Sequence, residues 1–283
     1  MALPAFPTQG QILAHWGLRV LGVFICCYLV VPILAFLPLS FSAQSFFHYP
    51  LTGLSLQWYR DFFTSPLWLL SFRNTFIVGI STTILATILG VLAALGLWRG
   101  NFPGRGIVMT VIVLPLITPS IIVGVGTYFT FAPFGLTNSF AGLIFAHTAL
   151  AVPFVVVTVL ATLSGFDRTM LRAASSLGAN PVTAFYKVML PLILPGVISG
   201  ALFALATSFD EVVVTLFLAG PQQRTLPRLM FTATADNTSL TLTAAAAVMV
   251  TMSLFLMLSV EWLRRRSDRI LRGKREATLA LSA

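Results

Sequence analysis

Long apolar stretches alternate with short polar segments along the whole chain. A helix that crosses the roughly 30 Å of bilayer hydrocarbon needs about 20 mostly apolar residues. A helix also satisfies its own backbone in lipid, whereas the alternating pattern of a membrane-barrel strand is absent from this sequence. The pattern therefore predicts an all-α integral membrane protein with six transmembrane helices. The predicted spans cover residues 16–39, 74–98, 106–131, 138–160, 193–219 and 240–263.

The composition supports this fold class. Hydrophobic residues make up 57% of the 283 residues and charged residues 9%, and the mean hydropathy is +0.94. Soluble domains carry about 25% charged residues, so a water-soluble enzyme is excluded. The adjacent cysteines Cys26 and Cys27 lie in an apolar run without metal-ligand spacing, so no metal site is predicted. We expect one membrane domain over 1–283.

The positions of the basic residues predict the topology. A net charge of +9 could indicate nucleic-acid binding, but seven of the 17 Lys and Arg residues fall within Arg264–Arg275, directly after the last span. Basic clusters of this kind mark the cytoplasmic side of a span. If the N-terminus is inside, 13 basic residues lie on inner segments and four on outer ones. Both termini, including the basic tail 264–283, are therefore expected in the cytoplasm, and no nucleic-acid partner is expected.

The inner segment 165–192, between the fourth and fifth spans, carries clear helix signals. Asp167 is placed to cap a helix, and Gly178 suits the left-handed position that ends one. Asn180 followed by Pro181 is typical of a second helix start. A simple connection needs only a few residues. The segment is therefore predicted to form two short helices that project from the membrane and dock on a partner.

The same segment resembles a known motif. Arg172-Ala173-Ala174, three residues, Gly178, nine residues and then Val188-Met189-Leu190-Pro191 are similar to the EAA loop of binding-protein-dependent ABC importer permeases. The family pattern is Glu-Ala-Ala, three residues, Gly, nine residues, Ile-x-Leu-Pro. The spacing matches throughout, but Arg172 stands where the family has Glu, and Val188 replaces Ile. We call residues 165–192 the coupling loop.

The resemblance implies a type I ABC importer permease fold in a bacterial inner membrane. It also implies a second homologous permease subunit, two ATPase subunits and an extracytoplasmic solute-binding protein as partners. The chain has no Gly-x-x-x-x-Gly-Lys loop, so ATP and Mg²⁺ are expected on the ATPase subunits, and this chain is expected to be a transport subunit rather than an enzyme. The implied ATPase-coupling residues are Arg172, Ala173, Ala174, Gly178, Asn180, Pro181, Leu190 and Pro191.

Two acidic residues, Asp210 and Glu211, interrupt the fifth span. A carboxylate at the bilayer centre costs about 2.5–3.5 kcal/mol on insertion scales, so each should face a partner or a wet cavity. One interpretation is a pathway for a cationic solute, lined also by Thr207, Phe209 and Tyr128, whose rings could add cation–π attraction. The alternative is a carboxylate bonded to a neighbouring helix or hydrated near the interface. His147 is expected to be a packing or helix-end histidine.

Further stretches are similar to spermidine/putrescine-type permeases, namely Gln57-Trp58-Tyr59, Ser208-Phe209-Asp210-Glu211, Gly220-Pro221 and Thr225-Leu226-Pro227. The predicted function is therefore ATP-driven import of a small organic cation such as spermidine or putrescine by alternating access. Another amine, an amino acid or an organophosphonate remains an alternative substrate. An ion-coupled secondary transporter is disfavoured because the acidic residues of the spans are concentrated in the fifth.

Overall fold

The computed structural model describes residues 8–45, 48–236, 240–259 and 261, so the basic tail 264–283 lies outside the described residues. The chain forms two compact units, one of residues 1–64 and 233–249 and one of residues 65–232 and 250–283. Across the described residues, the regular elements are helices, with one isolated bridge between Ser42 and Leu54. This confirms the all-α prediction. The single domain over 1–283 stays a prediction.

The first unit contains α1 (Gln9–Leu39) and α2 (Gln57–Thr64). The spanning part of α1, Leu13–Leu39, is not buried anywhere along its length. A helix that is apolar all round and uncovered requires lipid or another chain around it. Between α1 and α2, the Trp58 indole donates to the Ser42 carbonyl at 2.8 Å, so this aromatic residue helps to fold the connecting segment.

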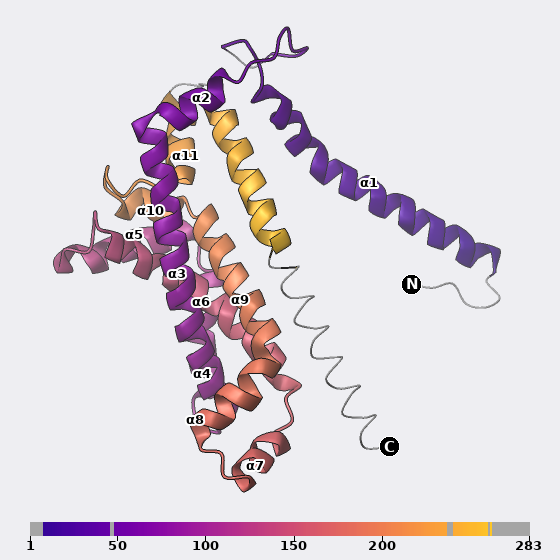
Figure 1. The fold of residues 1–283 in the computed structure, drawn as a ribbon, viewed down its shortest axis with the longest axis vertical. Coiled ribbons are helices and arrows are strands. Elements are labelled where there is room, and N and C mark those ends of the chain that lie inside the picture. Colours follow the sequence, from indigo (N-terminus) through magenta and orange to yellow (C-terminus); the bar gives the residue numbers. More distant parts are fainter. Residues whose placement is uncertain (1–7, 46–47, 237–239, 260, 262–283) are drawn as a thin grey trace. The chain divides into compact units, whose positions relative to one another are not determined.

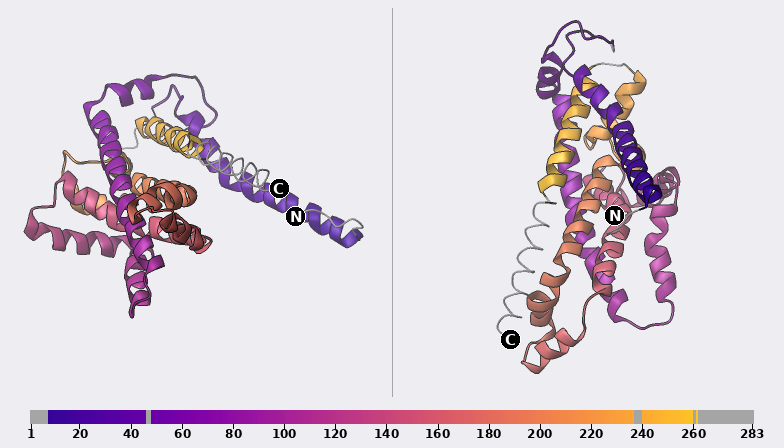
Figure 2. Two further views of the ribbon diagram at one scale, coloured as in Figure 1. Left: turned by 60° about the horizontal axis from the view of Figure 1, so that its bottom comes forward. Right: turned by 90° about the vertical axis from the view of Figure 1, so that its right-hand side faces the viewer.

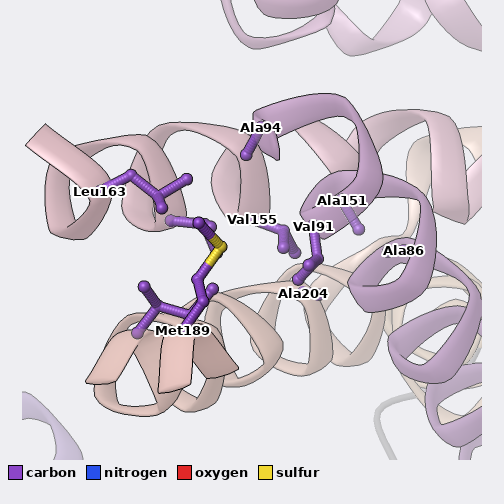
Figure 3. Packing of buried hydrophobic residues seen from close by; sticks show 10 residues of the cluster. Ala86, Val91, Ala94, Ala151, Val155, Leu163, Met189 and Ala204 are labelled. Carbon is purple, nitrogen blue, oxygen red and sulfur yellow. The ribbon is translucent and has the colours of Figure 1, made fainter. Parts of the chain in front are cut away.

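Three helices of the second unit pack against one another, as Figure 1 shows: α3 (Pro66–Arg99), α6 (Phe140–Ser164) and α9 (Leu190–Asp210). Their shared cluster contains Ala and Val side chains from all three helices, turned toward one another in Figure 3. Small residues allow membrane helices to approach closely. A Cβ at Gly90 would lie 2.6 Å from the Cβ of Val155, and one at Gly200 would lie 3.0 Å from its Cα.

The third predicted span is not a continuous helix. Residues 106–131 form α4 (Arg105–Ile117) and α5 (Ser120–Phe131), and the chain bends by 109° at the break. Pro119 has no N–H for a helical hydrogen bond, and it keeps the preceding Thr118 extended, with ψ 130°. The prediction of one continuous helix over 106–131 is therefore wrong. The described residues contain six spans only when α4 and α5 are counted together as one.

The fifth predicted span, 193–219, also differs. The helix begins earlier, at Pro181, and continues through the π-helical turn Phe185–Met189 into α9, which ends at Asp210. Pro191 cannot donate to the carbonyl four residues before it, and the wider turn accommodates this, because the Leu190 N–H bonds to the carbonyl of Phe185. A separate short helix, α10 (Val213–Leu218), follows the break.

The remaining helices are α7 (Thr169–Ser176), α8 (Pro181–Ala184), α11 (Leu226–Asp236) and the last apolar helix, Thr241–Ser259. Five helices are long and apolar enough to cross a membrane: α1, α3, α6, the helix Pro181–Asp210 and this last helix. The start of the second span also differs, because α3 begins at Pro66 rather than at residue 74. Proline is favoured at the first helical position.

The close approach of α3 and α6 generates a stability prediction. Gly90→Val would force a side chain into Val155, whose branched Cβ has little freedom to move. We expect a loss of roughly 1–3 kcal/mol in the free energy of unfolding, seen as a lower Tm in detergent. Gly96→Val on the same helix is the control, because a Cβ there meets nothing within 4 Å. Equal Tm values for the two variants would contradict the packing argument.

Candidate functional site

The break between α9 and α10 is organised by Glu211. This residue is extended, with φ −76° and ψ 112°, and it follows directly on Asp210, the last residue of α9. Its Oε1 accepts a hydrogen bond from the Val214 N–H at 2.8 Å, and its carbonyl accepts one from the Thr215 hydroxyl at 3.1 Å. The first N–H groups of a helix need such acceptors. Glu211 therefore caps α10 rather than lying on one face of a continuous helix.

His147 of α6 holds the two sides of the break together. The side chain is 1% exposed. Its Nδ1 lies 2.8 Å from the Ser208 hydroxyl of α9, and its Nε2 lies 3.0 Å from the Thr215 hydroxyl of α10. The sequence predicted only a packing or helix-end histidine. In the structure, both ring nitrogens of His147 also form hydrogen bonds. Ser208 and Thr215 flank the acidic pair in the sequence, but their common partner on α6 is visible only in the fold.

The other residues predicted to line a pathway are distributed differently. The Thr207 hydroxyl donates to the Phe203 carbonyl of its own helix at 2.8 Å. Phe209 is 5% exposed, and its ring meets Phe76 of α3 edge-on at 5.5 Å, so it is a packing residue. Asp210 is exposed, and its carboxylate forms no hydrogen bond or ion pair within the described residues. Tyr128 lies on α5, half-exposed, with its ring against Phe129.

The coupling loop has the caps that the sequence predicts. Asp167 accepts hydrogen bonds from the backbone N–H of Thr169 at 2.8 Å and from its hydroxyl at 2.5 Å. Gly178 has φ +85°, and the next residue bonds back to the Ala174 carbonyl at 3.0 Å, which closes α7. Asn180 Oδ1 accepts from the Thr183 N–H at 2.8 Å at the start of α8. The two predicted helices are confirmed, although the second is continuous with α9.

The surface of the coupling loop is both apolar and basic. Leu177 is 89% exposed, Val182 64% and Tyr186 62%. Arg172 and Lys187 are also exposed. Of the predicted coupling residues, Ala173, Gly178, Asn180 and Pro181 share this exposed surface, whereas Ala174, Leu190 and Pro191 are half-buried. Exposed apolar side chains on a rigid projection are typical of a protein docking surface. In Figure 1 and the right-hand view of Figure 2, α7 lies at the end of the second unit opposite α10.

Residues 86–272 match the family described as the binding-protein-dependent transport system inner membrane component. This chain belongs to that family. The match covers α6, the coupling loop, α9 and α10, and hence both parts of the candidate site. The protein is a multi-pass inner membrane component and a permease subunit of an ABC importer.

Known proteins agree with this assignment. The permease is 32% identical over 243 residues to the spermidine/putrescine transport system permease protein PotC of Haemophilus influenzae, covering 85% of this chain and 93% of the relative. Its fold is similar to that of a chain in a bacterial ABC transporter that imports the acidic polysaccharide alginate, with TM-score 0.70 and 17% identity over 93% and 99% of the two chains. A second structure of an alginate transporter, in complex with a pentasaccharide-bound periplasmic protein, gives TM-score 0.68 at 16% identity, over 90% and 94%.

Within the described part of the permease, no group of three or more His, Cys, Asp or Glu side chains could hold a metal ion. The chemistry that the site offers is hydrogen bonding and charge. The carboxylates of Asp210 and Glu211 and the negative end of the α9 dipole attract cations.

His147→Ala is expected to destabilise the permease. The change removes the partner of the buried Ser208 hydroxyl, whereas the Thr215 hydroxyl keeps its bond to the Glu211 carbonyl. An unpaired buried polar group costs about 1–3 kcal/mol. A lower Tm in detergent would report this loss. Ser199→Ala on α9 is the control, because that hydroxyl bonds only to its own helix, at the Pro195 carbonyl. An unchanged Tm in His147→Ala would show that the bridge is not needed.

A second prediction concerns the start of α7. Hydrogen bonds from the Thr169 side chain and backbone lower the pKa of Asp167 below its ordinary 3.8. A carboxylate with a lowered pKa contributes stability above its unfolded pKa and loses it as pH falls through the folded value. The cap therefore persists at neutral pH and is lost only below about pH 4.

The measurement is amide hydrogen exchange at Thr169 in Asp167→Ala, which should be faster than in the unaltered permease at pH 7. Asp167→Asn is the matched variant, because its amide oxygen still accepts from the Thr169 N–H, and it should restore most of the protection. Equal exchange in Asp167→Ala and the unaltered chain would refute the cap.

Proposed function

We propose that this permease carries small organic cations of the spermidine or putrescine type, and that ATP hydrolysis on separate subunits drives the transport. The observation that carries the proposal is the carboxylate of Asp210, exposed and unpaired among the described residues at the end of a helix inside a predicted span. The similarity to the spermidine/putrescine transport system permease protein PotC of Haemophilus influenzae supports the same substrate class.

The end of α9 favours a cation for two reasons. Asp210 brings a full negative charge, and the last carbonyls of α9 bring the negative end of the helix dipole. Among the described residues, Glu211 at the C-cap gives no hydrogen bond back to α9. Broken helices with free ends are a common construction for binding sites in transporters. An acidic polysaccharide or another anion would require basic groups here instead.

Glu211 supplies a second carboxylate beside the first, and this carboxylate accepts hydrogen bonds from the backbone N–H groups of Val214 and Val213 at the start of α10. Each carboxylate oxygen has two lone pairs, so this group can accept a further hydrogen bond from an ammonium group of the solute. A diamine or triamine with separated charges can then contact both carboxylates, whereas a single cation would contact one. In this proposal Thr207 and Tyr128 also line the pathway. Phe209 contributes indirectly, because its ring packs against Phe76.

The proposed assembly places the coupling loop and both termini in the cytoplasm, as the distribution of basic residues predicts. The coupling loop docks on one of two ATPase subunits, which bind ATP and Mg²⁺. A second, homologous permease covers apolar surface that is open in this chain, and a loaded extracytoplasmic binding protein delivers the solute. ATP binding closes the ATPase pair, and the permeases alternate between outward and inward access. No cofactor is bound by this chain in the proposal.

The test uses the complete assembly in nanodiscs with its binding protein, and it measures ATPase stimulation across a panel of polyamines, amino acids and organophosphonates. Asp210→Asn should raise the polyamine concentration for half-maximal stimulation roughly tenfold, the order of one lost charged contact. Glu211→Gln removes the charge but keeps an acceptor for the Val214 N–H, so an effect there comes from charge and not from the cap. Asp61→Asn is the control, because it removes the charge of an exposed carboxylate on α2.

Stimulation by polyamines that is unchanged in both variants would place recognition on the partner permease or the binding protein. Stimulation by another solute alone would leave the importer in place and overturn the polyamine assignment.

A further inference from the structure

The coupling loop is fastened to the end of α3 by one arginine. Arg168 precedes α7, and its guanidinium carbon lies 4.4 Å from the ring centroid of Trp98. Its Nη2 also donates a hydrogen bond to the Trp98 carbonyl at 2.7 Å. Phe166 meets the same indole edge-on at 5.7 Å. Two residues of the coupling loop, Arg168 and Phe166, therefore contact the indole of Trp98.

The chemistry of this contact suits arginine in particular. The Trp98 carbonyl belongs to the last turn of α3, where backbone carbonyls have no partner within the helix. A cation there also complements the negative end of the helix dipole. A planar guanidinium can stack on the indole and donate to the carbonyl at the same time, which a lysine ammonium cannot do in the same geometry.

The other end of α3 is bonded to the segment that follows α10. Asn74, which is 1% exposed, donates through Nδ2 to the carbonyls of Gln222 at 2.8 Å and Arg224 at 2.9 Å. The hydroxyl of Thr75 accepts from the Leu226 N–H at 2.8 Å. These three bonds join α3 to residues 222–226 through buried polar groups.

Between these two attachments α3 is one unbroken helix. No proline interrupts it after Pro66, and at 1.5 Å per residue the distance from Thr75 to Trp98 is roughly 35 Å. Near the Asn74 end, Gly79 is in direct contact with the Phe209 ring. Phe209 immediately precedes Asp210, so the same helix also touches the candidate solute site.

We propose that Arg168 is a positioning residue that couples the coupling loop to α3, and that α3 acts as a rigid link from this loop to residues 222–226. A displacement of the coupling loop then moves Trp98, and α3 carries the movement to Asn74 and Thr75. The inference rests on the proposed function in one respect, because it takes the ATPase subunits as the source of the displacement.

The first experiment measures solute transported per ATP hydrolysed by the complete assembly in proteoliposomes. Arg168→Lys keeps the positive charge but loses stacking on the indole, and we expect this ratio to fall roughly two- to fivefold, the order of an exposed cation–π contact. Arg99→Lys is the matched control. Arg99 is exposed, it neighbours Trp98, and its guanidinium forms no hydrogen bond or ring contact within the described residues. Its ratio should equal that of the unaltered assembly.

A double-mutant cycle tests whether the two ends act as one link. Asn74→Leu should lower the same ratio, and Arg168→Lys combined with Asn74→Leu should be no worse than the poorer single variant. Additive losses would show two independent contacts and overturn the rigid link. Co-purification of all subunits in equal amounts excludes a failure of assembly.

A second readout does not depend on the solute. Trapping the assembly with a non-hydrolysable ATP analogue should change amide hydrogen exchange at Leu226, whose N–H bonds to Thr75, and Arg168→Lys should abolish this change. An equal change in the unaltered and Arg168→Lys assemblies would overturn the inference. If instead polyamines fail to stimulate the unaltered assembly, the proposed substrate is wrong, whereas the exchange result still decides the role of Arg168.

Discussion

His147 of α6 forms hydrogen bonds to both α9 and α10, the two helices that flank the break at Glu211. A break in a spanning segment exposes backbone groups and polar side chains in a region without water, where each unsatisfied group costs several kcal/mol. Here Glu211 caps α10, and the imidazole of α6 pairs with one hydroxyl on each side of the break. The positions of α10 and of α5, which packs against it, depend on this arrangement. It also leaves Asp210 free at the end of α9.

The same unit combines this open end with tightly packed helices. Glycines bring α3, α6 and α9 so close that side chains at Gly90 or Gly200 would collide with Val155. Tight packing makes helices move as whole bodies, because a close-packed interface resists continuous deformation. A break at Glu211 and a bend at Thr118–Pro119 concentrate irregular backbone at two places. Rigid helices with localised breaks suit a protein that changes shape during transport.

The coupling loop is held rigid by caps and by packing. Its helices are capped by Asp167 and Asn180, and Phe166, Leu171 and Phe185 pack against the buried cluster around Leu163 and Met189. Its other side is exposed, with Leu177, Val182 and Tyr186 uncovered. Arg172 carries a positive charge where the family pattern has Glu, so the surface that receives it must differ in charge from one that receives a carboxylate. Within the loop, the hydrogen bonds of Arg172 are made by its backbone, to the Arg168 carbonyl and from the Ser176 hydroxyl, and its positive charge favours the carboxylate of the Asp167 cap.

The sequence by itself determined the features that depend on neighbouring residues or on total apolar length. The spans followed from runs of about 20 apolar residues, and the caps at Asp167, Gly178 and Asn180 followed from preferences that act within one helical turn. The spacing of the coupling loop identified the family. Only the tertiary structure decided where spans break, since Pro119 and the pair Asp210–Glu211 are compatible with either a kinked helix or two helices. It also decided which distant groups meet, such as His147 with Ser208 and Thr215, or Arg168 with Trp98. These contacts join residues far apart in the sequence, and no local propensity encodes them, because they form only when the helices have packed.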